Sequence, residues 1–463
     1  MRALVILVLA GGLLWLALQG FRSVRAEKES PPEPPRAGFI LPPRESVTAE
    51  APAAAPPQSN PTSAPAREPE SAAGTASKET PAIAKAPEAV PTPSEALASK
   101  PELADPPPPA RAAAPSTASP DELGAAGLIL ERPGEIPGFL QGPGRALAPE
   151  RKQLALALHH LVLGSGAEVR RIADQFEPGD GVRIDEVEFL RSALDSPDLA
   201  YSGDSPMLRA ASLSRAARAA EAHLAAGRSR DAALAYGAVL LGVLDAPWKS
   251  GREFLQACSD GLARAQRGYR WNPQADWPSI AVKVESGDSL ISVRKRALES
   301  HPDLLVCTGE IARANGLRGE MIHPGELLKI PTAHPNVLVD LDQHWALYRL
   351  DAEVVAAWEI GIGKPGSETP PGEYRAGEKT KEPMWFRAGH PPVPFGDPEN
   401  PLGTRWIAWQ LLDGKNSSLG FHGTRDPQSI GDDQSQGCVR MRKEAIEDLF
   451  EILPRGAVIR VRG

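Results

Sequence analysis

A His-Gly pair and a lone cysteine near the end of the chain are the residues best suited to nucleophilic chemistry. His422 and Gly423 lie in "GFHGT", and Cys438 lies downstream in "SQGCVRM". A thiol with an ordinary pKa of about 8.5 is mostly protonated at neutral pH, so it needs a base to become a nucleophile. The pattern therefore predicts Cys438 as nucleophile and His422 as base. The competing interpretation is a small buried thiol that lies near an imidazole by chance.

The residues around Cys438 favour the reactive interpretation. Gly423 and Gly437 remove side-chain bulk beside the reacting centre, and the backbone N–H groups of Gly437 and Cys438 are candidates for an oxyanion hole. Downstream, "MRKEAIEDLFEIL" carries apolar residues at helical spacing and stops at Pro454. We expect the N-terminus of this helix to lie close to the thiol and to lower its pKa.

The elements that must position these groups are mostly strands. "NVLVDLD", "HWALYRLD" and "EVVAAWEIGIG" are consecutive strand-like runs, and "GAVIRVRG" predicts a last strand. Residues 336–463 are therefore predicted to form a mostly β catalytic domain. Its aromatic and polar residues Trp385, Trp406, Trp409, Thr404 and Arg405 could line a substrate cleft, although core packing is the simpler role for the tryptophans.

Residues 338–463 resemble an L,D-transpeptidase catalytic domain of YkuD type. The motifs "GIGKPGSETPPGEY", "NPLGTRWI", "GFHGT", "SQGCVRM" and "GAVIRV" occur in the family's order. The resemblance implies that Cys438 attacks a peptidoglycan tetrapeptide stem, that His422 is the base and that the Gly423 carbonyl holds its ring. It also implies that Ser435 supports the active-site turn, and that Arg440 orients this turn or meets a substrate carboxylate. Gln436 stands where the family usually has a second His.

The resemblance implies an enzyme that crosslinks peptide stems through a cysteine thioester, with no metal and no organic cofactor. Three alternatives stay open: an L,D-carboxypeptidase, an enzyme that links a protein to peptidoglycan, or a non-catalytic peptidoglycan-binding scaffold. The chain has only 3 cysteines, Cys258, Cys307 and Cys438, and their wide spacing predicts neither a disulfide scaffold nor a zinc site.

Residues 280–332 predict a strand, two helices and a second strand. The "SGDSL" opening, the "NGL" turn and the "PGELLKIP" ending resemble a LysM domain. This resemblance implies binding of N-acetylglucosamine polymers by two loops, which contain Gly287, Asp288, Ser289, Leu290, Asn315, Gly316 and Leu317. The other interpretation is a spacer that binds no sugar.

Residues 149–275 are predicted to be α-helical. "LSRAARAAEAHLAAGRSRDAALAYGAVLLGVL" gives two helices joined at Gly227 and Arg228. This pair resembles one tetratricopeptide-like hairpin, which would bind a partner protein, but a small helical bundle that serves as a spacer fits equally well.

The N-terminal segments predict an exported protein. An apolar run follows Met1 and Arg2, so residues 1–26 are a signal peptide or, as we favour, a retained inner-membrane anchor. Residues 27–148 are rich in Pro and Ala and predict a disordered tether. We therefore expect a cell-envelope or periplasmic protein whose partners are the membrane, glycan strands and tetrapeptide stems. The net charge of -8 with mixed signs argues against nucleic acid.

Overall fold

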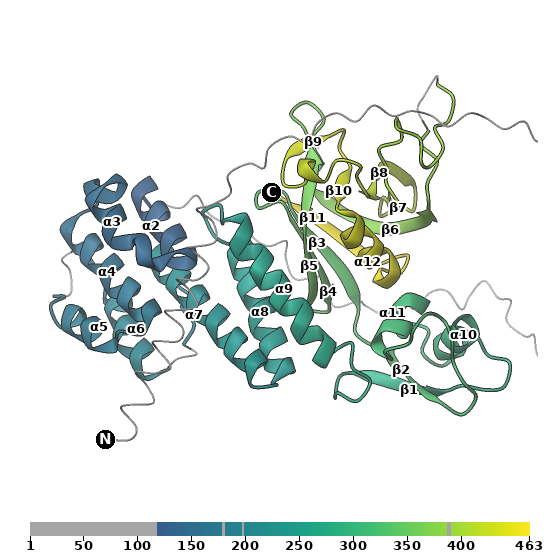
Figure 1. The fold of residues 1–463 in the computed structure, drawn as a ribbon, viewed down its shortest axis with the longest axis horizontal. Coiled ribbons are helices and arrows are strands. Elements are labelled where there is room, and N and C mark those ends of the chain that lie inside the picture. Colours follow the sequence, from purple (N-terminus) through teal and green to yellow (C-terminus); the bar gives the residue numbers. More distant parts are fainter. Residues whose placement is uncertain (1–117, 178–180, 197–198, 387–389) are drawn as a thin grey trace, which may run out of the picture. The chain divides into compact units, whose positions relative to one another are not determined.

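The computed structural model describes residues 118–177, 181–196, 199–386 and 390–463. The predicted anchor, residues 1–26, and the predicted tether up to residue 117 lie outside the described residues. The described ranges contain helices, then a small β–α–α–β unit, then a β-rich domain, as Figure 1 shows. None of the helices in these ranges has the length and apolar character that a bilayer crossing requires.

The helical region begins earlier than the sequence predicts. Helices α2 (Pro120–Glu131), η1 (Pro133–Glu135), α3 (Ile136–Gln141) and η2 (Pro143–Ala146) all lie within the segment assigned to the tether. The prediction of a tether was therefore wrong for residues 118–148. The prolines that suggested disorder sit in first turns of helices, where a missing N–H costs nothing.

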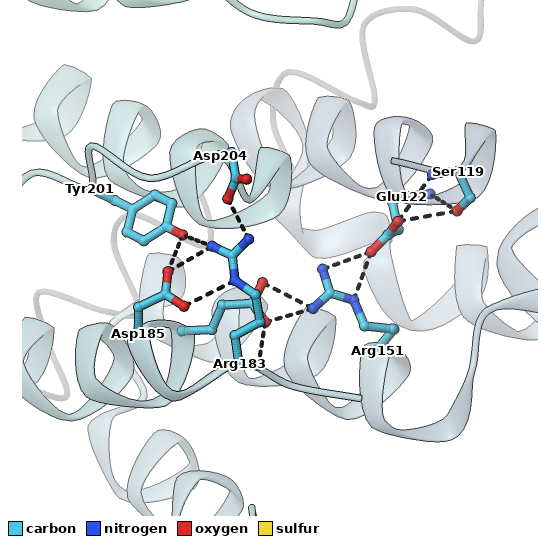
Figure 2. A network of polar contacts seen from close by, with 8 residues as sticks. Ser119, Glu122, Arg151, Arg183, Asp185, Tyr201 and Asp204 are labelled. Atoms are coloured by element: carbon cyan, nitrogen blue, oxygen red, sulfur yellow. Dashed lines mark hydrogen bonds and ion pairs between the residues drawn. The ribbon is translucent and has the colours of Figure 1, made fainter. Parts of the chain in front are cut away.

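A capping box and a buried ion network hold α2 in place. Ser119 Oγ accepts from the Glu122 N–H at 3.2 Å, and the Glu122 carboxylate accepts from the Ser119 N–H at 3.0 Å. Arg151 pairs with Glu122 at 2.7 Å (Figure 2). It also pairs with the buried Glu186 at 2.7 Å. This guanidinium thereby joins three helices that are far apart in sequence.

The remaining helices follow the predicted pattern. They are α4 (Pro149–Leu163), α5 (Gly166–Ala173), α6 (Ile184–Asp195), α7 (Pro206–Ala225), α8 (Ser229–Leu244) and α9 (Arg252–Gly268). Helices α7 and α8 join at Gly227, as predicted, and the φ of 73° at this residue explains the glycine.

The predicted β–α–α–β order is present between residues 279 and 331. Strand β1 (Ser279–Lys283) pairs antiparallel with β2 (Leu327–Pro331), and α10 (Leu290–Ser300) and α11 (Thr308–Ala314) lie between them in sequence. A small apolar core that includes Val293, Ile311 and Ile330 joins the helices to the strands.

The β-rich domain is a nine-stranded sheet that closes on itself. Its strand order is β10-β8-β7-β6-β11-β3-β4-β5-β9, and β10 also pairs with β5. This second pairing gives the sheet a barrel-like form. The strands are β3 (Pro335–Asp340), β4 (Trp345–Leu350), β5 (Glu353–Gly363), β6 (Gly372–Lys381), β7 (Arg405–Gln410), β8 (Asn416–His422), β9 (Asp433–Ser435), β10 (Val439–Met441) and β11 (Val458–Arg462), with helices η3 (Pro427–Ser429) and α12 (Lys443–Ile452) between strands.

Both faces of β3, β4 and β5 are buried, each in a different core. On β4, Ala346 and Tyr348 pack with α12 residues such as Ile446, whereas Trp345 and Leu347 belong to the core of the helical region. This alternation follows from the period of two along a strand. Helices α8 and α9 therefore cover the second face, beside β5 in Figure 1. The helical region is a structural layer of the β-rich domain.

Two glycines inside helices allow this packing to be tested. A Cβ at the buried Gly237 would lie 3.3 Å from Val354 Cβ of β5, whereas a Cβ at Gly127 of α2 would meet nothing within 4 Å. We expect Gly237→Leu to destabilise the chain by about 1–3 kcal/mol, because the added side chain pushes α8 away from the sheet. Gly127→Leu is the matched control and should hold or raise stability. Thermal unfolding followed by circular dichroism measures both, and equal melting temperatures would contradict the interface.

Candidate active site

His422 and Cys438 lie on neighbouring parallel strands. His422 ends β8, and Cys438 immediately precedes β10. The register pairs Arg440 with His422 and Val439 with Phe421, which leaves Cys438 opposite Gly420. Because side chains alternate along a strand, Cys438, Arg440 and His422 share one face of the sheet. The topology thus brings the predicted nucleophile and base together as diagonal neighbours.

The imidazole of His422 is buried and fixed in one tautomer. His422 is 5% exposed, and its Nδ1 lies 2.6 Å from the Gly423 carbonyl oxygen. A carbonyl only accepts, so Nδ1 donates its proton and Nε2 keeps a free lone pair. The ring also stacks on Trp406, with centroids 5.9 Å apart. Burial lowers the pKa of His422 to about 4, against a smaller opposing effect of the Gly423 carbonyl, so the ring is neutral at pH 7.

The Cys438 thiol is half-buried and protonated at rest. Its Sγ lies 3.8 Å from the Ser418 carbonyl oxygen, to which it donates. Burial raises the pKa of this thiol above its ordinary value. Burial also raises the pKa of Cys258 to about 12 and that of Cys307 to about 11, and Cys258 is only 3% exposed. The resting state is therefore a neutral thiol beside a neutral imidazole.

Helix α12, which follows Cys438 in sequence, does not begin at the thiol and does not lower its pKa. Strand β10 separates Cys438 from Lys443, the first residue of α12. A helix dipole acts within its first turn, so the expected effect on the thiol was wrong. Strand β10 must lie between the thiol and α12, because it pairs with both β8 and β5 and so closes the sheet.

Ser435 and Gly437 shape the turn before the thiol. Ser435 Oγ donates to the Cys438 carbonyl oxygen at 2.6 Å and accepts from the Gly437 N–H at 3.1 Å. The φ of 102° at Gly437 suits glycine alone. Because the Gly437 N–H is already bound by Ser435, it does not point to a substrate oxygen. Of the two amides predicted for the oxyanion hole, the structure leaves that of Cys438 as the candidate.

Arg440 supplies positive charge beside both groups. It lies directly opposite His422 in the register and is half-buried. Burial has the largest effect on the pKa of His422 and of Cys438. The positive charge of Arg440 has a smaller effect, and it lowers the pKa of both groups. An anionic species at the thiol, whether thiolate or substrate carboxylate, would be stabilised by this guanidinium.

A cavity of about 200 Å³ opens on the His422 side of the site. Gly423, Gly403 and Thr404 line it, together with the basic side chains of Arg425 and Lys443. These two cations were not predicted from the sequence, although Arg425 directly follows "GFHGT" and Lys443 lies within "MRKEAIEDLFEIL". Cys438 does not line this cavity. Arg405 does not line it either, because its guanidinium donates to the Thr404 carbonyl and lies over Phe450, 5.3 Å from the ring centroid.

The tryptophans have separate roles. Trp406 stacks on the His422 imidazole, whereas Trp409 is fully buried in the core. Trp385 pairs with Val393 through the backbone in the segment that precedes β7. Gly420 leaves room for the Trp406 ring beside the imidazole, because a Cβ at Gly420 would lie 2.7 Å from this ring.

The residues predicted to bind glycan divide into two groups. Leu290, Gly316 and Leu317 line a groove of about 420 Å³, which Glu451 of α12 also borders. The others are engaged within the fold. Asp288 pairs with Arg296 at 2.6 Å, Ser289 caps α10, Asn315 bonds to both backbone groups of Lys329 and Gly287 forms a turn with φ of 86°. In the described part of the chain, no three His, Cys, Asp or Glu side chains gather so that they could hold a metal ion.

Comparison with known proteins identifies the β-rich domain. The family model for the YkuD L,D-transpeptidase catalytic domain matches residues 335–461. YqjB of Bacillus subtilis (strain 168), an L,D-transpeptidase by name, is 31% identical over 122 residues, which cover 26% of this chain and 68% of YqjB. YkuD of the same strain is 23% identical over 39% of this chain and 98% of its own. The solved L,D-transpeptidase from Mycobacterium smegmatis is 22% identical, covers 30% of this chain and 64% of its own, and has a TM-score of 0.24. The chain belongs to the L,D-transpeptidase family of YkuD type.

Proposed function

We propose that this protein crosslinks the peptide stems of peptidoglycan through a thioester on Cys438. One observation carries the proposal: an imidazole with a fixed, unprotonated Nε2 lies on the same sheet face as the thiol, in a chain of this family. Neither of the other cysteines has such a partner among the described residues, and Cys258 is sealed in the helical core.

The reaction follows from the protonation states. As the thiol leaves the Ser418 carbonyl and turns to His422, Nε2 accepts its proton and the sulfur attacks the carbonyl carbon of the third stem residue. The intermediate collapses to a thioester, and the imidazolium returns the proton to the departing D-alanine amine. An amine of a second stem then attacks the thioester, and His422 takes and returns a proton again. The low pKa of His422 favours the return of the proton at each step.

The charges around the site fit a peptide stem. Arg440 lies beside the thiol, and Arg425 and Lys443 line the cavity on the Gly423 side. The terminal D-alanine carries a carboxylate, so these cations supply attraction at the end of the stem that departs. No carboxylate lines this cavity in the described residues.

We further propose that the β–α–α–β unit is a LysM domain that holds the glycan. Its groove combines apolar side chains and glycines with the charged side chains of Arg313, Glu320 and Glu451, and such a mixed lining offers a sugar both apolar contact and hydrogen bonds. The unit is docked on the catalytic domain rather than freely suspended. Cys307 Sγ donates to the Glu451 carbonyl at 3.0 Å, and Arg313 pairs with Asp448 of α12. A bound strand would therefore raise the effective concentration of stems at Cys438.

Export and membrane attachment complete the proposal. The support is in the sequence, where an apolar run follows Met1 and Arg2 and a Pro/Ala-rich segment follows residue 26. A retained anchor with this tether would place the catalytic domain in the cell envelope, within reach of peptidoglycan. Determination of the mature N-terminus distinguishes the anchor from a cleaved signal peptide.

The reaction and its base can be tested together. Incubation of the purified chain with a disaccharide tetrapeptide should give a crosslinked dimer by mass spectrometry, and Cys438→Ala should give none. His422→Ala should slow the formation of a carbapenem adduct on Cys438 by about 10²–10⁴-fold, because the thiol loses its base. His334→Ala, at a side chain that is 70% exposed, is the control and should react normally. Trimmed tripeptide alone would indicate a carboxypeptidase, and unchanged substrate a scaffold.

The protonation states predict a particular pH dependence for the thiol. Because burial raises the pKa of Cys438, the rate of alkylation by iodoacetamide should climb about tenfold per pH unit through neutrality and beyond pH 8.5. Because the pKa of His422 is about 4, no imidazolium stabilises a thiolate between pH 5 and 8. Site-resolved mass spectrometry measures the rate. A plateau of fast alkylation at acidic pH would reveal a thiolate–imidazolium pair and would refute the neutral resting state.

The glycan groove can be tested by filling it. Thr308 lines the groove, whereas Ile291 of α10 lies outside it and is 70% exposed. Thr308→Trp should weaken the binding of soluble N-acetylglucosamine oligomers at least about tenfold, because the indole occupies the sugar's place. Ile291→Trp should bind like the wild type. Isothermal titration calorimetry measures both, and equal affinities for the two variants would exclude this groove.

A further inference from the structure

The segment between β8 and β10 carries Cys438 at its C-terminal end. It runs through η3, Ile430, Gly431 and β9 before the turn at Ser435. The outer half of β5 holds part of it: the Gly431 N–H donates to the Ile360 carbonyl at 3.0 Å, and the Ile362 N–H donates to the Asp432 carbonyl at 3.1 Å. The position of the thiol therefore depends on what fixes this segment.

The helical region reaches the same segment through Arg252, the first residue of α9. Its Nη2 donates to the Ile430 carbonyl oxygen at 2.9 Å, and its Nε pairs with Glu359 of β5. Glu359 is only 6% exposed. A guanidinium can bind two acceptors at once in a fixed geometry, so Arg252 joins the segment and the strand rigidly.

Glu359 connects both ends of the active-site segment. Its second oxygen accepts from Arg442 Nη2 at 2.9 Å. Arg442 follows β10 directly, whereas Ile430 precedes β9, so the two arginines bracket the stretch that contains Cys438. The backbone is shaped for this contact. Gly431 has φ of 92°, and a Cβ there would collide with the Arg252 guanidinium.

A second route leads from the helical region to the same segment. The side chain of Gln343, in the β3–β4 turn, accepts from the Ser250 N–H at 3.1 Å and donates to the Trp248 carbonyl at 2.8 Å. The next residue, His344, bonds through Nε2 to Asp433 of β9 at 2.6 Å. The residues just before α9 thus fix the turn whose histidine holds β9.

We propose that Arg252 is a positioning residue for Cys438, through which the helical region fixes the segment that carries the nucleophile. The inference rests on the proposed function, because it takes Cys438 as the reacting group. It assigns residues 118–275 a part in catalysis: the helical layer sets the geometry of the thiol. Loss of the Arg252 contacts leaves the fold of the sheet in place but lets the turn move.

The test uses two reactions of the same thiol that should respond in opposite directions. In Arg252→Gln, a looser turn exposes Cys438, so iodoacetamide alkylation at pH 7 should rise at least about threefold. Carbapenem adduct formation needs the thiol and His422 in register and should fall about tenfold or more. Arg264→Gln is the matched control, because Arg264 lies on α9 and its partners Glu221 and Tyr236 both belong to the helical region. It should change neither rate by more than about twofold.

Internal reporters separate positioning from unfolding. Cys258 and Cys307 should stay unlabelled in Arg252→Gln, because both are protected by the fold. Arg252→Lys keeps a charge for Glu359 but cannot also bridge to Ile430, so it should restore the adduct rate only in part. Full restoration by Lys, or rates in Arg252→Gln within about twofold of wild type, would overturn the proposal. Labelling of Cys258 in Arg252→Gln would assign Arg252 to folding and would also overturn it.

These readouts are independent of crosslinking. If the wild type forms the carbapenem adduct but no crosslinked dimer, the proposed function fails while the role of Arg252 is still decided. If the wild type forms dimer and Arg252→Gln behaves like Arg264→Gln, the function stands and the positioning role falls.

Discussion

The hydrogen bond from His422 Nδ1 to the Gly423 carbonyl is the interaction on which the site depends. It fixes the tautomer, so that Nε2 keeps a free lone pair and can act as a base. It is made within a pair of adjacent residues, and Gly403 approaches the backbone of Gly423 closely. A Cβ at Gly403 would lie 2.8 Å from Gly423 Cα. Two glycines therefore permit the close packing of the backbone beside this imidazole.

Burial of that imidazole decides how the thiol is activated. A cysteine that reacts as a preformed thiolate needs a protonated partner, but the buried ring has a pKa of about 4 and stays neutral. Proton transfer must then accompany attack. Before it, the thiol hydrogen bond must move from the Ser418 carbonyl to His422 Nε2. A thiol at rest in this state is protected from oxidation and from adventitious electrophiles.

Local patterns in the sequence predicted much of the β-rich domain. Strand runs such as "HWALYRLD" and the helix that ends before Pro454 are correct, and the structure places the predicted nucleophile Cys438 and the predicted base His422 beside each other in the sheet. The early helices were missed because Pro120, Pro133 and Pro149 occupy first turns, where proline is favourable, while the composition around them predicts disorder. The helical layer could have been predicted from β4. A strand with apolar residues on both faces needs another layer packed on each side of the sheet.

Contacts across the fold could not be predicted in this way. Arg252 and Ile430 are far apart in sequence, and Arg252 belongs to no motif. Their meeting follows from the packing of α9 on β5. The buried Glu359 between Arg252 and Arg442 is a poor source of stability, because the cost of removing its charge from water offsets most of the attraction. Apolar residues of similar size would hold the layers together as well. Apolar residues would not, however, fix the Ile430 carbonyl relative to β5. The directional hydrogen bonds of the planar Arg252 guanidinium do so. The cluster is therefore better explained by the position of the segment that carries Cys438 than by the stability of the fold.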